Sequence, residues 1–376
     1  MIPELASTVF APASIVATPL PIDLVLIGAR GKVGSAFRRQ LGRQQAALRA
    51  EIDIDLRLVA TFDRRGFAFD SRGLMPGTGD TYLPERRVDD AENLFVYITR
   101  GGASRTLVVD CTASDEIADL YPRLLMGGVG IVAANKRANA RCHSSYQRLQ
   151  RLARESGVPY RYETTVGAAI PLLGPLRDLR LRGERVISLE GVLSGSLSYI
   201  LHRLHEGCAF SEAVAEAQAL GYTEPDPLED LRAVDLSRKL LVMAREAGFV
   251  VEADALSIEP LADPAVAAGQ GLIDALRAID ADWHERIRVA QARNERWVML
   301  AKADADGGRI GLRAVPEHSA FAQLRPGQNL ISIRTELQDQ MPLCVSGPGA
   351  GVEITAAGVL SDVLMAATHW PKKQER

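Results

Sequence analysis

The sequence has 376 residues, of which 47% are hydrophobic and 24% charged, and its formal net charge at pH 7 is −3. This length suffices for two domains that each bury a core, and the composition is that of an ordinary globular protein. The sequence has no long basic run, no metal-ligand cysteine spacing and no apolar run of roughly 20 residues, which argues against nucleic-acid-binding, zinc-binding and membrane-spanning proteins.

The first residues and the cysteines bear on where the protein is found. Residues 1–20 lack a basic start and a sustained apolar core, so we expect a poorly ordered leader and not a signal peptide. The four cysteines, Cys111, Cys142, Cys208 and Cys344, are scattered along the chain. This pattern is typical of a protein in the reducing cytoplasm.

Short apolar runs alternate with amphipathic stretches from residue 24 onward. We predict strands at 24–27, 56–62, 107–109 and 131–134, and helices at 33–48, 116–126 and 143–155. Alternating strands and helices predict an α/β fold, a Rossmann-like, doubly wound parallel sheet with helices on both faces.

The character of the sequence changes after about residue 160, which indicates a second domain. We predict a strand at 186–193, helices at 197–205, 211–220 and 231–247, several short strands between 298 and 346, and a last helix at 352–367. The run Asp306-Gly307-Gly308 indicates a hairpin. The second domain is therefore expected to be α+β, with the boundary near 156–160.

A glycine-rich turn, Gly28-Ala29-Arg30-Gly31-Lys32-Val33-Gly34, follows the first predicted strand and opens the first predicted helix. Glycine lets the backbone turn tightly and approach a pyrophosphate, whose charge the helix N-terminus stabilises. The spacing is one residue longer than GxGxxG in its first half. A glycine-rich turn without a ligand is the alternative.

The end of the second predicted strand bears on the choice of dinucleotide. It reads Thr61-Phe62-Asp63-Arg64-Arg65. A carboxylate here favours a free ribose 2′-hydroxyl, as in NAD, whereas arginines favour a 2′-phosphate. Two guanidiniums beside one carboxylate leave a net positive site, so we expect NADP, with NAD possible.

Two further segments follow predicted strands, at the edge where open α/β sheets bind ligands. In Asp110-Cys111-Thr112-Ala113-Ser114 the small side chains can touch a cofactor, and Ser114 can equally cap the next helix with Asp115 in its first turn. Lys136 comes just after another strand, where it could bind a substrate carboxylate or a phosphate. A solvated surface lysine is the alternative.

The segment 221–230 is rich in acidic residues and prolines, and it leads into a helix carrying Asp235 and Lys239. Prolines fix φ, so this loop is expected to hold its carboxylates stiffly enough to recognise a substrate ammonium group. Asp235 and Lys239 are four residues apart and share a helix face. They form either an ordinary surface ion pair or, beside a carbonyl substrate, a site in which Lys239 is the general acid.

Four long motifs together resemble the homoserine dehydrogenase family: residues 162–171, 191–200, 221–227 with Asp235 and Lys239, and 347–351. The resemblance runs from about residue 24 to the final helix and is strongest to the dehydrogenase half of the bifunctional aspartate kinase–homoserine dehydrogenases. Neither the kinase half nor a regulatory ACT domain is recognisable, so threonine feedback is not expected. The resemblance implies NAD(P)-dependent interconversion of aspartate semialdehyde and homoserine by a cytoplasmic homodimer.

The resemblance also implies roles for individual residues. Lys239 would donate and accept the proton, paired with Asp235, and the substrate would be bound by Glu224, Asp230, Asp235 and Lys136. Cofactor contacts are expected from Gly28, Arg30, Gly31, Lys32, Val33, Gly34, Asp63, Arg64, Thr112, Ala113, Ser114, Lys136, Gly221, Gly349, Ala350 and Gly351. A structural sodium ion would be held by Glu163, through its carboxyl or backbone, and the carbonyls of Val166, Ala168 and Ile170, since an oxygen cage suits a hard cation.

Because residues 347–351 return to the cofactor, the nucleotide-binding domain is expected to be discontinuous, comprising 21–160 and about 346–376. Residues 161–345 would form the substrate-binding and dimerisation domain. Two other functions remain open. An aspartate semialdehyde dehydrogenase would need a cysteine nucleophile, for which Cys111 is the candidate near the crevice. A non-catalytic nucleotide-binding regulatory relative is the other alternative.

Overall fold

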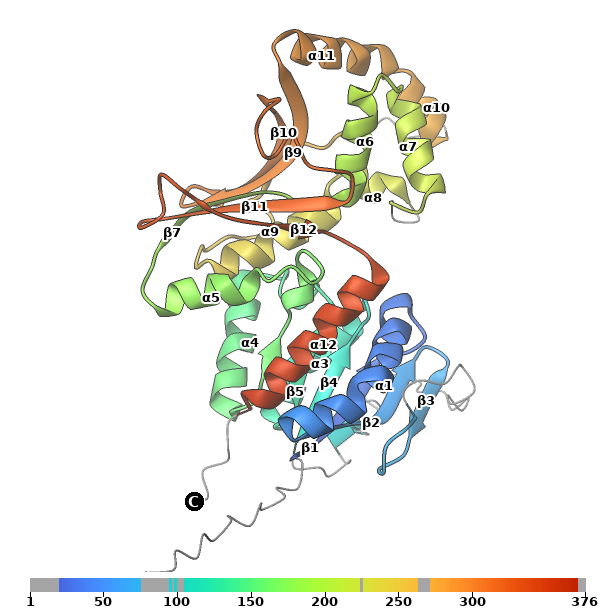
Figure 1. Ribbon diagram of the computed structural model, residues 1–376, viewed down its shortest axis with the longest axis vertical. Helices are drawn as coiled ribbons and strands as arrows, with labels where there is room; N and C mark the ends of the chain where they lie inside the picture. Colours follow the sequence, from blue (N-terminus) through green and yellow to red (C-terminus); the bar gives the residue numbers. More distant parts are fainter. Residues whose placement is uncertain are drawn as a thin grey trace, which may run out of the picture.

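The structure is a computed structural model that describes residues 20–75, 95–96, 98–99, 105–223, 226–262 and 271–370. Figure 1 shows two sheets, one above the other along the long axis, each covered by helices. The expected leader lies outside the described residues except for Leu20, where the first strand begins. No helix in the described part is both long and apolar enough to cross a membrane.

The first sheet is built from the N-terminal part of the chain, with strand order β3-β2-β1-β4-β5-β6. Its elements are β1 (Leu20–Ile27), α1 (Lys32–Ile52), β2 (Ile54–Asp63), β3 (Gly66–Phe69), β4 (Thr106–Asp110), α3 (Asp115–Met126), β5 (Gly130–Ala133), α4 (His143–Ser156) and β6 (Tyr160–Arg161). Helices α1 and α12 (Val352–Thr368) pack together on it, as do α3 and α4. The predicted Rossmann-like, doubly wound α/β fold is confirmed.

One strand corrects the expectation of a wholly parallel sheet. β3 pairs antiparallel with β2, and Asp63 is opposite Gly66. The two arginines that follow Asp63 therefore form a two-residue turn, and the chain folds straight back along the sheet edge. Gly66 has a φ of 144°, a conformation that favours glycine and so permits the tight return.

The second sheet has the order β12-β11-β7-β9-β10-β8 and is antiparallel except for β8, which pairs parallel with β10. Its strands are β7 (Val186–Val192), β8 (Ser257–Ile258), β9 (Glu295–Asp304), β10 (Gly307–Pro316), β11 (Gln328–Thr335) and β12 (Leu343–Pro348). Asp304 is paired with Gly307, so the predicted hairpin is confirmed. The predicted α+β character of this part is confirmed as well.

Helices flank this second sheet, and one of them carries the candidate catalytic pair. They are α5 (Leu173–Leu181), α6 (Gly195–His205), α7 (Phe210–Ala219), α8 (Pro227–Leu231), α9 (Val234–Glu246), α10 (Leu272–Arg277) and α11 (Asp280–Ala292). In Figure 1, α9 lies between the second sheet and the first. The helix predicted at 231–247 begins at Val234 instead, because Ala233 is left-handed with a φ of 59°, and Leu231 ends the separate helix α8.

Candidate functional site

The glycine-rich turn connects β1 to α1 and fits a pyrophosphate. Gly28 has a φ of 83°, and its carbonyl oxygen accepts a hydrogen bond from Gly31 N at 3.0 Å. A Cβ on Gly34 would lie 2.2 Å from the Gly28 oxygen, so only glycine permits this approach. Gly31 caps α1 without a side-chain hydrogen bond, which leaves the first amides of the helix to a phosphate. Lys32 is exposed and Val33 is half-buried at the start of this helix.

The end of β2 is joined to that turn by an ion pair. Arg30 Nη1 lies 3.1 Å from Asp63 Oδ1, which also accepts the backbone N–H of Arg65 at 2.7 Å. The other carboxylate oxygen, Oδ2, is buried and has no hydrogen-bond partner in the described part of the chain. Such an oxygen is suited to a ligand hydroxyl. Arg64, which follows directly, is exposed.

The segment after β4 is organised by Asp110, a fully buried carboxylate to which the sequence assigned no role. Asp110 accepts hydrogen bonds from Tyr121 Oη at 2.7 Å, Asn135 Nδ2 at 3.0 Å and Thr112 N at 2.8 Å. It thereby ties the loop after β4 to the loop after β5. Thr112 faces the glycine turn, since a Cβ on Gly28 would lie 3.0 Å from its methyl group.

The predicted helix cap at Ser114 is confirmed, because its hydroxyl accepts the N–H of Ile117 at 3.3 Å. Ala113, beside it, is exposed. Strands β1, β4 and β5 are parallel neighbours with Ile27, Asp110 and Ala133 in register. The three candidate segments that follow these strands therefore lie at one edge of the sheet.

At the same edge, two lysines from different parts of the chain share one carboxylate. Lys239 Nζ lies 2.9 Å from Asp235 Oδ2, and Lys136 Nζ lies 3.3 Å from Asp235 Oδ1. The side chains of Lys239, Lys136 and Asp235 are 12%, 28% and 36% exposed. Burial alone would raise the pKa of Asp235, but the two ammonium groups outweigh it and hold that pKa well below its ordinary value. Asp235 is therefore ionised at neutral pH.

Lys239 has a second partner, the carbonyl oxygen of Leu193, to which its Nζ donates at 2.9 Å. This carbonyl belongs to the turn between β7 and α6. The left-handed Ala233 ends α8 and puts Asp235 in the first turn of α9, one turn before Lys239. The ammonium group is thus held by its own helix and by the turn after β7, and its side chain is mostly buried.

The acidic loop is described in part. Asp230 accepts a hydrogen bond from Ser196 Oγ at 2.6 Å, and the Asp226 side chain caps α8 by accepting the N–H of Leu228 at 3.0 Å. Gly221 is exposed just after α7, with a φ of 72°. Glu224 lies outside the described residues.

The candidate nucleophile of the alternative dehydrogenase is a poor one. Burial, with a contribution from Asp110, raises the pKa of the Cys111 thiol far above its ordinary value. A thiol must ionise to attack a carbonyl carbon, so this environment suppresses its reactivity. The geometry therefore disfavours catalysis by Cys111.

The segment proposed for sodium begins with Glu163, whose carboxylate already accepts three backbone N–H groups. These come from Leu172 and Leu173, each at 2.5 Å, and Gly174 at 2.8 Å, at the start of α5. The Glu163 carboxylate is thus engaged at the start of α5. Within the described residues no group of three His, Cys, Asp or Glu side chains could hold a metal ion.

The C-terminal glycine turn brings the last helix beside α1. A Cβ on Gly349 would lie 2.1 Å from the buried Asn329 side chain, so the backbone approaches more closely than other residues permit. Gly351 caps α12, and Ala350 is exposed between them. At the start of α12, Glu353 accepts a hydrogen bond from Gln40 of α1 at 3.0 Å.

Two family models match the chain. The model described as homoserine dehydrogenase matches residues 171–364, and the model described as its NAD binding domain matches residues 30–163. Together they cover the glycine-rich turn from Arg30 onward, both lysines and Asp235.

Curated relatives include bifunctional aspartokinase/homoserine dehydrogenases. The chain is 34% identical to isoform 2, chloroplastic, of Zea mays over 352 residues, covering 90% of this chain and 38% of that protein. It is 33% identical to isoform 2 of Escherichia coli K12, covering 91% and 43%. The chain thus spans about two fifths of the length of these relatives.

Solved structures share the fold. A protein of unknown function from Candida auris has a TM-score of 0.84 at 30% identity, covering 93% of this chain and 99% of that one. A putative homoserine dehydrogenase from Archaeoglobus fulgidus has a TM-score of 0.75 at 22% identity, covering 92% and 99%. A hyperthermophilic archaeal homoserine dehydrogenase in complex with NADPH has a TM-score of 0.71 at 22% identity, covering 94% and 100%.

Proposed function

Because the chain belongs to the homoserine dehydrogenase family, we propose that it interconverts L-aspartate 4-semialdehyde and L-homoserine with NAD(P) in threonine and methionine biosynthesis. The observation that carries this proposal is the Lys239 ammonium group, 12% exposed and joined through Asp235 to Lys136 at the carboxyl edge of the first sheet. A dehydrogenase acting on a carbonyl group needs a proton donor at this edge, beside the bound dinucleotide.

The dinucleotide fits the residues at this edge. When bound, it supplies or takes up the hydride. The glycine-rich turn would hold the pyrophosphate. Glycine at position 34, where a Cβ would lie 2.2 Å from the Gly28 oxygen, lets the backbone turn tightly enough for this contact. The unpartnered Asp63 Oδ2 would accept a ribose hydroxyl. Further contacts are proposed for Thr112, Ala113, Ser114, Lys136, Gly221, Gly349, Ala350 and Gly351.

In the reduction, the aldehyde oxygen gains negative charge as hydride reaches the carbon, and Lys239 donates its proton to that oxygen. In the oxidation the same nitrogen accepts the hydroxyl proton of homoserine. Asp235, ionised because two ammonium groups lower its pKa, holds Lys239 in position through both half-reactions. The ammonium of Lys239 also stabilises the developing alkoxide electrostatically.

The amino acid part of the substrate carries an ammonium group and a carboxylate. We assign the ammonium group to Glu224, Asp230 and Asp235, and the carboxylate to Lys136, whose charge is of the right sign. Asp230 is fixed for this purpose by the 2.6 Å hydrogen bond from Ser196. Its rigid position favours recognition of one amino acid geometry.

Steady-state oxidation of homoserine, followed as reduced dinucleotide absorbance, tests the proposed function. We expect turnover with homoserine and no requirement for phosphate. NADPH binding without turnover would instead identify a non-catalytic nucleotide-binding relative. Turnover of aspartate semialdehyde that requires phosphate and disappears in Cys111→Ser would identify an aspartate semialdehyde dehydrogenase.

NADP is proposed as the preferred cofactor, because Arg30, Arg64 and Arg65 outnumber the carboxylate Asp63. The same assay with NAD and NADP side by side tests this preference. Free cysteines, including exposed Cys142 and Cys344, support a cytoplasmic location.

A structural sodium ion is proposed on the backbone oxygens of Glu163, Val166, Ala168 and Ile170. Two consecutive left-handed residues, Gly167 at 73° and Ala168 at 55°, give this segment the sharp turn that such a cage needs. Replacing sodium by tetramethylammonium at constant ionic strength should lower the melting temperature. An unchanged melting temperature would contradict this site.

We also propose a homodimer formed through residues 161–345. Leu337 and Met341, in the connection between β11 and β12, are 80% and 84% exposed, and a partner would cover them. Light scattering would measure the mass. The nucleotide-binding domain would comprise 21–160 and about 346–376, because α12 packs on α1 and β5.

A further inference from the structure

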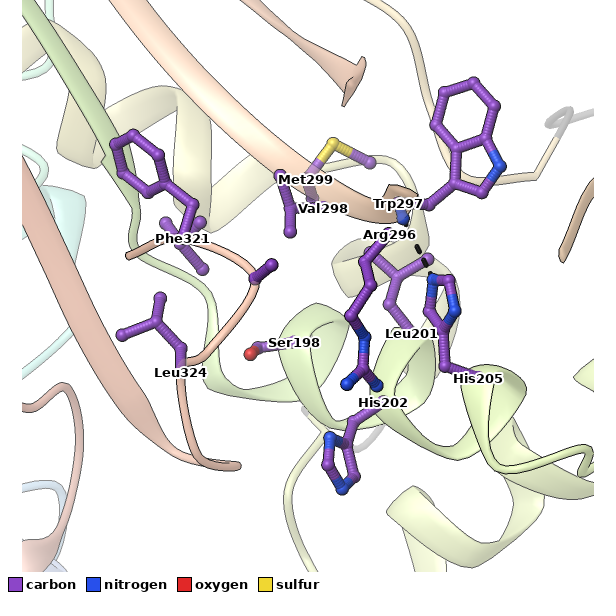
Figure 2. A pocket seen from close by; sticks show the side chains of 12 residues that line it. Ser198, Leu201, His202, His205, Arg296, Trp297, Val298, Met299, Phe321 and Leu324 are labelled. Carbon is purple, nitrogen blue, oxygen red and sulfur yellow. Dashed lines mark hydrogen bonds between the residues drawn. The ribbon is translucent and has the colours of Figure 1, made fainter. Parts of the chain in front are cut away.

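A second pocket lies away from the two lysines, between α6, the first half of β9 and the segment after β10. Figure 2 shows the side chains that line it. They are Val192, Ser198, Leu201, His202, His205, Arg296, Trp297, Val298, Met299, Phe321, Ala322 and Leu324. The contacts described above give this pocket no role in the proposed reaction.

One end of the pocket is polar and carries a positive charge. In Figure 2 the Arg296 guanidinium extends toward Ser198 and His202. Arg296 is half-buried, and no carboxylate of the described residues lies within 4.0 Å of it. The carboxylate on the neighbouring turn, Glu206, is instead bound by Arg203 and lies 3.4 Å from His202. A half-buried guanidinium without a counterion is a binding group for an anion.

The other histidine of the pocket forms part of its wall. His205 Nε2 accepts the backbone N–H of Trp297 at 2.9 Å. Burial, followed by the nearby Arg296 and His202, lowers the pKa of His205 to about 4. The ring is therefore neutral at pH 7, and Arg296 supplies the permanent charge of the pocket.

The opposite end is apolar. Val298, Phe321 and Leu324 gather on one side of the pocket in Figure 2. Val298 is 9% exposed. A polar end beside an apolar end suits a small carboxylate with a short hydrocarbon tail, because the guanidinium pairs with the carboxylate while the tail leaves water.

The pocket is connected to the candidate catalytic lysine by the backbone. Val192, the last residue of β7, lines the pocket, and the carbonyl of the next residue, Leu193, accepts the hydrogen bond from Lys239 at 2.9 Å. The pocket residues of α6 lie on the helix whose first turn contains Ser196, the partner of Asp230 at 2.6 Å. A displacement of β7 or α6 at the pocket thus moves groups that hold Lys239 and Asp230.

We propose that this pocket is an effector site for a short aliphatic monocarboxylate, and that its occupation changes turnover through the Leu193 carbonyl. The ligand pairs with Arg296 and places its tail against Phe321 and Leu324. Binding itself is independent of the proposed dehydrogenase activity, whereas the effect on turnover rests on it.

Propionate serves as the probe, with uncharged propionamide as the matched control ligand. The first measurement is the melting temperature of the full chain, with homoserine saturating so that the substrate site is blocked, and with sodium chloride balancing ionic strength. A ligand that binds the folded state raises the melting temperature in proportion to RT ln(1 + [L]/Kd). Propionate should raise it and propionamide should not.

The decisive variant is Arg296→Gln, because it removes the charge and keeps a polar side chain. Propionate should bind it at least about tenfold more weakly, since a charge-assisted hydrogen bond is lost. Arg293→Gln is the control, as Arg293 is exposed near the same strand and does not line the pocket. It should bind propionate as the wild type does.

The second measurement is homoserine oxidation with and without propionate. Propionate should change kcat in the wild type and in Arg293→Gln, and it should leave kcat unchanged in Arg296→Gln. Excess homoserine should not reverse the change, because propionate and homoserine bind at different sites. The effector site would be overturned if Arg296→Gln bound propionate as tightly as the wild type does, or if the wild type bound propionamide as tightly as propionate. Dissociation of a dimer in Arg296→Gln would overturn it as well. Binding without any effect on kcat would overturn the coupling, and no turnover at all would overturn the proposed function instead.

Discussion

Replacement of Lys239 by Met tests the proton donor with little change in side-chain volume. The contacts of Lys239 predict a large effect of this replacement on turnover and a small one on stability. Positioned proton transfer contributes about 10²–10⁴-fold, or roughly 3–5 kcal/mol of the barrier. The lost hydrogen bond to the Leu193 carbonyl costs about 1 kcal/mol. The ion pair with Asp235, 36% exposed, adds about 0.5 kcal/mol, and Asp235 keeps Lys136 as a partner.

We therefore expect Lys239→Met to fold, to bind NADPH as the wild type does, and to lose at least about a hundredfold in kcat. Homoserine oxidation, fluorescence titration with NADPH and urea unfolding measure the three quantities. Lys302→Met is the matched control, since Lys302 forms ion pairs with Glu190 at 3.2 Å and Asp304 at 3.4 Å in the second sheet. Turnover of Lys239→Met equal to that of Lys302→Met would refute the assignment of Lys239 as proton donor. A loss of NADPH affinity as large as the loss of kcat would refute it as well.

Three further changes probe the cofactor site and the buried charge. Arg64→Ala should lower kcat/KM for NADP about tenfold and leave NAD unchanged, and equal losses with both cofactors would contradict a 2′-phosphate contact. Gly34→Ala should cost about 1–3 kcal/mol in urea unfolding and weaken NADPH binding, because its Cβ meets the backbone at 2.2 Å. Gly271→Ala, with its nearest contact at 3.6 Å, is the control and should change neither. Burial raises the pKa of Asp362 from 3.8 to about 6, so the wild type should lose about 3 kcal/mol of stability from this group as pH rises from about 4 to 6. Asp362→Asn should lack that loss of stability. If the free energy of unfolding depends on pH in the same way in the wild type and in Asp362→Asn, the pKa of Asp362 is ordinary.

Local sequence patterns predicted the features that depend on neighbouring residues. The strand predicted at 107–109 and the helix at 143–155 match β4 and α4, because continuous apolar runs and helical periodicity are properties of short windows. The Asp235–Lys239 pair was predicted for the same reason, since four residues make about one helical turn. The Ser114 cap likewise joins residues only three positions apart.

Contacts between distant segments were not predictable in this way. Lys136, which follows β5, meets Asp235 of α9 although about a hundred residues separate them, and Arg30 reaches Asp63 because β1 and β2 are neighbours. The role of Asp110 was missed because its three donors come from different elements. The missed helix α11 has its apolar residues Trp283, Ile287 and Ala290 spaced by four and three among charged ones, a signal present in the sequence.

Helix α9 explains how the two sheets keep the candidate catalytic pair in place. Its first turns carry Asp235 and Lys239, and its last residues, Arg245 and Glu246, are 1% exposed. Thirteen residues make a rod of roughly 20 Å, so the two pairs lie at opposite ends of one rigid element.

Both ends of this rod contact the nucleotide-binding part of the chain. At the C-terminal end, Arg245 Nη1 donates to the Asn139 carbonyl at 2.6 Å, and Tyr146 Oη donates to Glu246 at 3.1 Å. At the N-terminal end, Asp235 binds Lys136. A hydrogen bond with one charged partner contributes about 1.5–3 kcal/mol, so these C-terminal contacts resist rotation of the helix. Hydride and proton transfer tolerate displacements of less than about 1 Å, and a helix anchored at both ends satisfies that limit before any ligand binds.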